Sequence, residues 1–135
     1  MHYKIEEVEG IGPSYGKKLA AAGIVTTGTL LKTCGSAKGR KQIAAQCGVS
    51  ESLLLKWTNL ADLMRVSGVG KQFSELLEAA GVDTVKELRN RRPDNLAAKM
   101  KEVNAKKRLT RATPSVAKVT TWVTQAKALK PAVSH

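Results

Sequence analysis

Aromatic residues, cysteine and histidine are all scarce in this chain of 135 residues. Two Trp, two Tyr and one Phe leave a hydrophobic core to be built mainly from aliphatic side chains. The cysteines, Cys34 and Cys47, form no C-x-x-C pair, and the histidines are His2 and His135, so the sequence lacks the ligand spacing of a zinc cluster. The cysteines can form one disulfide or stay reduced, and a cytosolic location favours two thiols.

Long apolar runs and strand-like patterns are also missing. No segment approaches the ~18 apolar residues of a membrane-spanning helix, and residues 1–9 are too polar and acidic for a signal peptide. No stretch sustains the alternation of apolar and polar residues that is typical of a half-buried strand. We therefore expect an all-α cytoplasmic protein that has no membrane partner.

The charge that is present is strongly one-sided. Lys and Arg number 23 against 11 Asp and Glu, which gives a formal net charge of +12. Residues 63–135 carry 15 of the basic side chains and 6 of the acidic ones, so the second half is the more electropositive. Such a charge attracts polyanions, which favours nucleic acid as the partner over a merely solubilising surface.

An internal repeat organises the chain. Residues 8–12 (VEGIG) recur 58 positions later as residues 66–70 (VSGVG). The residues around Trp57 and Trp122 match at an offset of 65, which indicates seven extra residues late in the second copy. No Gly/Pro/Ser-rich linker separates the copies. We expect two helical repeats, residues 1–62 and 63–135, that pack together with pseudo-two-fold symmetry.

Apolar spacing and capping residues predict helices in both copies. In the first copy they are expected at residues 14–22, 27–34 with Thr27 as cap, 36–48 and 51–64. In the second copy they are expected at residues 71–80, to about residue 90 with Asp83 or Thr84 as cap, from Pro93 onward, and 115–129. Gly23 and Gly81 follow the first helix of each copy, where glycine suits a left-handed C-terminal cap.

Each VEGIG-type segment joins two helices through a glycine-containing turn. The glycines allow a tight turn and a close approach of another molecule to the backbone. The helix that follows begins with unpaired amide N–H groups and the positive end of its dipole, which together suit one phosphate. Lys17 and Lys18 in the first copy, and Lys71 in the second, add positive charge near this point.

Residues 8–24 (VEGIGPSYGKKLAAAGI) and 64–82 (MRVSGVGKQFSELLEAAGV) resemble the helix-hairpin-helix motif of DNA polymerase beta, DNA ligases and DNA-repair nucleases. The whole chain resembles a bacterial family of standalone double helix-hairpin-helix proteins built on a domain of unknown function. The resemblance implies phosphate contacts from backbone amides around Ile11 and Val69. The matching donors are Gly10, Gly12, Ser14 and Tyr15, and Gly68, Gly70, Gln72 and Phe73.

The resemblance also implies one ion as the only cofactor. In the polymerase, hairpin carbonyls hold a monovalent cation, K⁺ or Na⁺. The matching carbonyls are those of Glu6, Val8 and Ile11, and of Met64, Val66 and Val69. The position that is often Ala in the family, four residues after the second glycine, holds Gly16 and Ser74, which are also small.

The two hairpins differ in the charges beside them. Glu6, Glu7 and Glu9 precede the first and oppose a phosphate there, whereas Arg65 and Lys71 flank the second. The second hairpin is therefore expected to bind phosphate more strongly. In the alternative interpretation, one or both hairpins only connect helices.

Two further segments bear on nucleic-acid contact. Residues 42–59 (QIAAQCGVSESLLLKWTN) resemble a helix-turn-helix that would turn Ser50, Glu51, Ser52 and Lys56 toward base edges, but three consecutive leucines favour a packed helical pair. Residues 86–118 hold 11 basic and 3 acidic side chains. Two clusters there are expected to track phosphates, at a helix end and in a loop respectively: Arg89, Arg91 and Arg92, and Lys106, Lys107, Arg108 and Arg111.

The remaining motifs favour a structural role over a catalytic one. Trp57 and Trp122 are flanked by apolar positions and are expected to anchor the core. Asp83 is better explained as a helix cap than as the catalytic Asp of a helix-hairpin-helix glycosylase. The sequence holds no Ser/His/Asp set and no metal-ligand spacing, so no enzyme is expected.

The sequence therefore predicts sequence-independent binding of duplex DNA. The expected roles are repair, recombination or nucleoid organisation, with a DNA-processing protein as a further partner. Two alternatives remain: a helical protein-interaction module, and binding of structured RNA, because phosphate contacts distinguish the two sugars poorly.

Overall fold

The computed structural model describes residues 3–135, and both halves of this range are helical. After a 3-10 turn, η1 (Ile5–Glu7), the first half forms α1 (Pro13–Ala21), α2 (Thr27–Cys34), α3 (Ala37–Cys47) and α4 (Glu51–Leu63). The second half forms α5 (Lys71–Ala79), α6 (Val85–Leu88), α7 (Pro93–Lys107) and α8 (Val116–Ala128). Within residues 3–135, β-type pairing is limited to one isolated bridge between Lys4 and Thr26. The all-α class expected from the sequence is confirmed.

Polar caps set most helix starts. The hydroxyl oxygens of Ser36, Ser50 and Ser115 accept hydrogen bonds from amides three residues further on, as the sequence predicts. The cap of α2 is Thr26, one residue before the predicted Thr27, which is buried. Thr84 caps α6.

Two helix ends differ from the prediction. Helix α6 ends at Leu88 and not near residue 90, because the Asn90 and Arg91 amides donate to carbonyls three residues back, at Glu87 and Leu88. Helix α7 continues to Lys107, so Lys106 and Lys107 lie on a helix and not in a loop. Arg108 ends α7 in the left-handed conformation, with a φ of 51°.

The two halves repeat the same local features. Gly10 and Gly68 both have a φ of +90°. Gly23 and Gly81, in the positions predicted for left-handed caps, have φ values of +82° and +96°. Helices α4 and α8 each have 13 residues, whereas α7 has 15 residues and α3 has 11. The extra residues of the second copy thus lengthen α7 and the loop after it.

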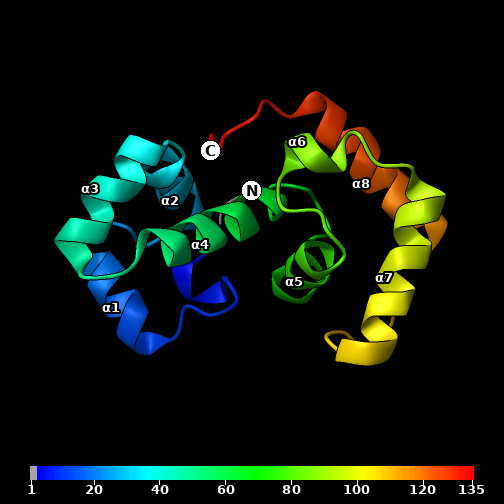
Figure 1. Ribbon diagram of the computed structural model, residues 1–135, viewed down its shortest axis with the longest axis horizontal. Coiled ribbons are helices and arrows are strands. Elements are labelled where there is room, and N and C mark those ends of the chain that lie inside the picture. Colours follow the sequence, from blue (N-terminus) through cyan, green and yellow to red (C-terminus); the bar gives the residue numbers. More distant parts are fainter. Residues whose placement is uncertain (1–2) are drawn as a thin grey trace.

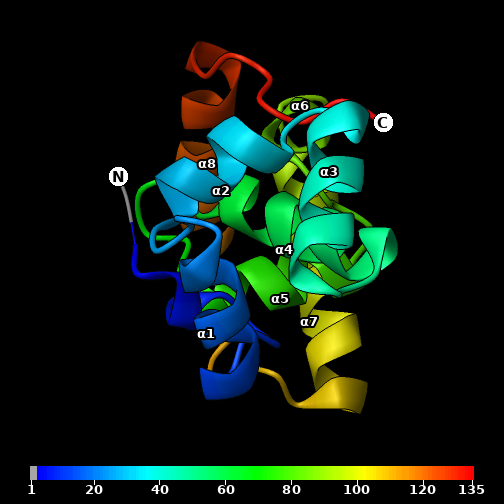
Figure 2. The ribbon, with the colours of Figure 1, turned by 90° about the vertical axis from the view of Figure 1, so that its left-hand side faces the viewer.

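The halves lie side by side, with α1 to α4 on one side and α5 to α8 on the other (Figure 1). Helix α6 and the C-terminal end lie at the top of this view, whereas the end of α7 lies at the bottom with α1 low on the left. The view turned by 90° agrees, with α6 at the top and α1 and α7 low (Figure 2). Each half has its own apolar cluster, and the last turn of α4 contributes Leu63 to one cluster and Met64, just after it, to the other.

Polar contacts also join the halves. The buried Asp62 carboxylate at the end of α4 accepts a hydrogen bond of 2.9 Å from the Val85 amide at the start of α6. The segment after α8 returns to the first half, where the Arg40 guanidinium donates to the Ser134 carbonyl at 2.7 Å. Arg40 is only 5% exposed and also donates to the carbonyls of Cys34 and Gly35.

The helix-turn-helix-like segment is exposed at the start of α4 and buried toward its end. Every residue of α4 from Trp57 to Leu63 is buried. This part of α4 is packed, as the run of leucines favours, whereas Ser50, Glu51 and Ser52 at its N-terminal end are exposed. Lys56 is exposed, but its ammonium lies 3.9 Å from the Glu78 carboxylate across the interface between the halves.

The two cysteines are free thiols in the structure. Burial raises the pKa of the Cys34 thiol to about 11, which keeps it protonated at neutral pH. Burial also raises the pKa of the Cys47 thiol, which donates to the Lys18 carbonyl. Of the two states that the sequence leaves open, the structure has the reduced one.

Candidate nucleic-acid interface

Each VEGIG-type segment forms a tight turn closed by one backbone hydrogen bond. The Ile11 amide donates to the Val8 carbonyl at 3.1 Å, and the Val69 amide donates to the Val66 carbonyl at 3.0 Å. The third residue of each turn is a glycine with a φ of +90°, the conformation that a type II turn needs there. We call these two turns hairpin 1 (residues 8–12) and hairpin 2 (residues 66–70).

A tryptophan supports each turn from below. A Cβ atom added at Gly10 would lie 3.3 Å from Nε1 of Trp57, and one added at Gly68 would lie 3.3 Å from Nε1 of Trp122. Both tryptophans are 1% exposed, as expected of core anchors. Tyr15 on α1 and Phe73 on α5 pack against the same rings, with centroid distances of 4.9 and 5.2 Å.

The helix after each turn begins with amides that have no acceptor. Gly12 and Gly70 are the N-caps of α1 and α5. Neither glycine has a side chain that could accept a hydrogen bond from the first amides of its helix. The first helical bonds run from the Gly16 amide to the Gly12 carbonyl and from the Ser74 amide to the Gly70 carbonyl. Seven earlier amides have no partner among residues 3–135: those of Gly12, Ser14 and Tyr15, and of Gly70, Lys71, Gln72 and Phe73.

The second glycine of each turn faces open space. A Cβ added at Gly12 or Gly70 meets no atom within 4 Å, and both residues have negative φ values that any residue can adopt. The backbone at these two positions is therefore accessible to another molecule. Gly10 and Gly68 differ, because their positive φ values would strain a larger residue.

The charges around hairpin 1 are mixed. Lys17 and Lys18 are exposed, and neither has an ion-pair partner among residues 3–135. The Lys18 ammonium lies 5.8 Å from the centre of the Tyr15 ring. Glu6 lies against α1, where a Cβ at Gly16 would come within 2.9 Å of its carboxylate.

The expected charge advantage of hairpin 2 is not found. Arg65 donates to the Asp62 carboxylate and to the Lys130 carbonyl, both at 2.8 Å, and its side chain is 20% exposed. Lys71 lies 3.7 Å from the Glu9 carboxylate of hairpin 1. Arg65 is therefore bound within the protein. The charge of Lys71 is offset by Glu9, which lies far from Lys71 in the sequence.

One cation near hairpin 2 was not found by sequence reasoning. The Lys118 ammonium at the start of α8 lies 5.4 Å from the centre of the Phe73 ring. The equivalent cation at hairpin 1, Lys18, comes from the hairpin helix itself. No sequence signal relates the two lysines, because different helices bring them to equivalent rings.

An acidic cavity of about 390 Å³ lies between the halves beside hairpin 1. Glu9, Glu75 and Glu78 line it together with Lys56 and Lys107. Burial raises the pKa of the Glu75 carboxyl, and the charge of Glu9 raises it further. Carboxylates from the two separate copies of the repeat therefore gather next to hairpin 1.

The two predicted basic clusters lie at opposite ends of α7. Arg92 and Arg108 are its N-cap and C-cap, and its 15 residues span about 22 Å at 1.5 Å per residue. Lys107 lines the cavity beside hairpin 1, so the cluster of Lys106, Lys107 and Arg108 is the one near the hairpins. The cluster of Arg89, Arg91 and Arg92 lies away from it, and the structure does not bring the two together.

The carbonyls that the resemblance assigns to a cation are partly used. The Val8 and Val66 oxygens each accept the hydrogen bond that closes their turn. A carbonyl has two lone pairs, so each oxygen retains one for an ion. No group of three or more His, Cys, Asp and Glu side chains suited to a metal occurs in residues 3–135, and His2 lies outside this range.

Comparison with known proteins finds one family. The family model described as domain of unknown function (DUF4332) matches residues 9–129. No curated protein and no solved structure matches the chain. Across residues 3–135, none of the helices has the length and apolar character needed to cross a bilayer.

Proposed function

We propose that this chain, which belongs to the family described as domain of unknown function (DUF4332), binds duplex DNA without sequence preference through two helix-hairpin-helix motifs. The observation that carries the proposal is the pair of equivalent turns, each followed by a helix whose first amides are unpaired and open. Such amides donate to phosphate oxygens, with the helix dipole adding to the attraction.

Each hairpin would hold one phosphate. At hairpin 1 the donors are the amides of Gly12, Ser14 and Tyr15, with Lys17 and Lys18 as nearby cations. At hairpin 2 the donors are the amides of Gly70, Gln72 and Phe73, with Lys118 nearby and Lys71 released from Glu9 when phosphate binds. Lys106, Lys107 and Arg108 lie near the same surface and would contact flanking phosphates.

The proposal includes no catalytic step. A K⁺ or Na⁺ ion held by the turn carbonyls would add positive charge beneath the phosphate. The contacts involve backbone amides and flexible cations on phosphate, and such contacts carry no sequence information. The cellular role would be in DNA repair, recombination or nucleoid organisation, next to a DNA-processing protein.

Duplex affinity should fall steeply with salt and vary little with sequence. If ~4–6 phosphates are engaged, the plot of log affinity against log salt should have a slope of about −4 to −5, because each contact releases condensed counterions. Titrations at several salt concentrations with two scrambled duplexes, a single strand and a structured RNA measure both properties.

A flat salt dependence, or a strong preference for one duplex sequence, would contradict this proposal. Tighter binding to structured RNA than to duplex DNA would show that the hairpins bind the phosphates of RNA in preference to those of DNA. Absence of binding to all four probes would favour a protein-interaction module in which the hairpins only connect helices.

A further inference from the structure

The side chain of Glu9 reaches from hairpin 1 to the helix that follows hairpin 2. Glu9 is the second residue of its turn, and its carboxylate lies 3.7 Å from the ammonium of Lys71, the first residue of α5. Burial, and then the charge of Glu9, raises the pKa of the Glu75 carboxyl, one turn further along α5. Residues four apart lie on one face of a helix. Glu9 therefore lies beside the first turn of α5.

The corresponding residue of hairpin 2 makes a different contact. Ser67 occupies the position of Glu9 in the second copy of the repeat. Its amide donates to the side-chain oxygen of Gln125 at 2.9 Å, which ties hairpin 2 to α8 of its own half. The residue that matches Gln125 in the first copy is Leu60, which is buried. Of the two turns, hairpin 1 is thus the one that carries a carboxylate, and this carboxylate lies at the other hairpin.

Lys71 is the cation nearest in the sequence to the open amides of hairpin 2. It directly precedes Gln72 and Phe73, whose amides have no partner among residues 3–135. The Lys71 and Glu9 side chains are 50% and 43% exposed, so solvent and DNA can reach both. An exposed ion pair is weak, so a phosphate can displace the carboxylate.

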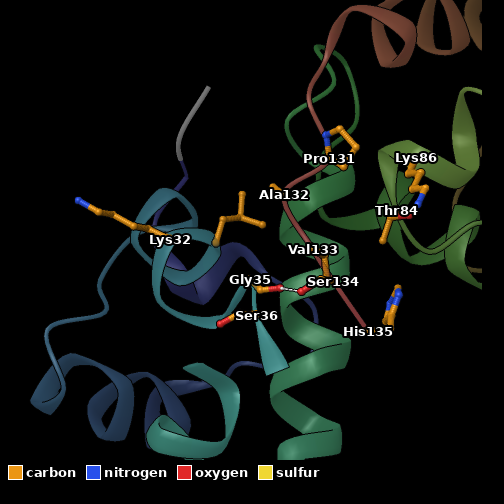
Figure 3. A pocket seen from close by; sticks show the side chains of 11 residues that line it. Lys32, Gly35, Ser36, Thr84, Lys86, Pro131, Ala132, Val133, Ser134 and His135 are labelled. Carbon is orange, nitrogen blue, oxygen red and sulfur yellow. Dashed lines mark hydrogen bonds between the residues drawn. The ribbon is translucent and has the colours of Figure 1, made fainter. Parts of the chain in front are cut away.

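Other contacts between the halves hold Glu9 beside α5. The Asp62 carboxylate accepts a hydrogen bond from the Val85 amide. The segment after α8 also returns to the first half, where Figure 3 shows Ser134 beside Gly35, and the Ser134 amide donates to the Gly35 carbonyl at 2.8 Å. Because these contacts join the halves, an exchange of partners at Lys71 requires only side chains to move.

We propose that Glu9 is an autoinhibitory residue that competes with DNA phosphate for Lys71 and so limits the affinity of hairpin 2. This inference rests on the proposed function of the hairpins. A phosphate that binds at hairpin 2 must first displace the Glu9 carboxylate from Lys71, and the cost of this displacement lowers the affinity for duplex. The affinity of hairpin 2 is thus set in part by a residue of hairpin 1.

Replacing Glu9 by Gln tests the competition, because Gln keeps the size of the side chain and removes its charge. Glu9→Gln should tighten duplex binding about three- to fivefold at low salt, in keeping with the strength of an exposed ion pair. Equilibrium titrations with one duplex measure the change. A Glu9 side chain that only supports the fold would give an unchanged or lower affinity.

A double-mutant cycle shows whether the gain depends on Lys71. Lys71→Gln removes the cation for which Glu9 and phosphate compete. In the Lys71→Gln protein, Glu9→Gln should change the duplex affinity by less than about 1.5-fold, because no lysine is left to release. An equal gain with and without Lys71 would show a general repulsion between Glu9 and DNA, and would contradict the competition.

Glu87→Gln is the matched control. The Glu87 side chain is 46% exposed and lies 3.6 Å from Arg91, so its ion pair resembles that of Glu9 and Lys71. Its removal changes the net charge equally and should alter the duplex affinity by less than about 1.5-fold. An equal gain from Glu87→Gln would assign the effect to net charge and contradict the inference. Thermal melts check that the variants fold, and Glu9→Ser repeats the test if Glu9→Gln does not.

The outcomes separate this inference from the proposed function. Duplex binding that Glu9→Gln leaves unchanged or weakens contradicts the role of Glu9 and leaves the hairpin proposal standing. Absence of duplex binding by both the natural protein and Glu9→Gln contradicts both.

Discussion

Replacing Gly70 by Glu should weaken duplex binding at least about tenfold, which corresponds to roughly 1.4 kcal/mol. The new carboxylate would lie where the phosphate is expected, beside the unpaired amides of Gln72 and Phe73. Loss of one phosphate contact should also reduce the steepness of the salt slope by about one unit. Equilibrium titrations at several salt concentrations measure both effects.

The structure supplies the control for this variant. A Cβ at Gly70 meets no atom within 4 Å, and its φ of −103° suits any residue, so neither Gly70→Glu nor Gly70→Ala should strain the fold. Gly70→Ala adds no charge and should bind duplex much more tightly than Gly70→Glu. If folded Gly70→Glu binds like the natural protein, hairpin 2 is a connector between helices.

The equivalent change at hairpin 1 should have a similar effect. The sequence favours hairpin 2 because of Arg65 and Lys71, but Arg65 is bound to Asp62 and Lys71 lies beside Glu9. These contacts remove the difference in free positive charge between the two hairpins. Gly12→Glu should therefore weaken duplex binding about as much as Gly70→Glu.

Replacing Asp62 by Ala should lower the free energy of unfolding by about 3–5 kcal/mol, the usual cost of removing one partner of a buried ion pair. The Asp62 side chain is 1% exposed and accepts hydrogen bonds from the Arg65 guanidinium and the Val85 amide. Its removal leaves a buried amide unpaired and Arg65 without its counter-charge. Urea unfolding followed by circular dichroism measures the change.

Asp94→Ala provides the comparison for Asp62→Ala. Asp94 also pairs with an arginine, Arg92, but both side chains are mostly exposed. An exposed pair contributes little to stability, so Asp94→Ala should unfold like the natural protein. Equal effects of the two variants would show that the Asp62 contacts carry no special weight in joining α4 to α6.

Local features of the fold could be predicted from the sequence because each depends on nearby residues. The glycine after α1 and the glycine after α5 adopt the left-handed conformation expected of them. Ser36, Ser50 and Ser115 cap the helices that they precede. Capping and glycine conformation act over a few residues, so a pattern of that length is enough to reveal them.

Contacts between distant segments could not be predicted in the same way. The pairing of Glu9 with Lys71 spans 62 positions, and the hydrogen bond from Arg40 to the Ser134 carbonyl spans 94. Lys118 reaches the Phe73 ring only because α8 packs beside α5 in space. These contacts depend on how the helices pack, and composition and spacing along the chain hold no record of that arrangement.

The central claim is that the hairpin amides bind phosphate, and amide NMR spectra recorded during a duplex titration test it most directly. The resonances of Ser14 and Tyr15, and of Gln72 and Phe73, should shift strongly, because their N–H groups gain an acceptor. Those of Gly16 and Ser74, already bonded to the carbonyls of Gly12 and Gly70, should shift much less. If duplex binds while the first four resonances stay unchanged, the hairpins do not hold phosphate and the account is wrong.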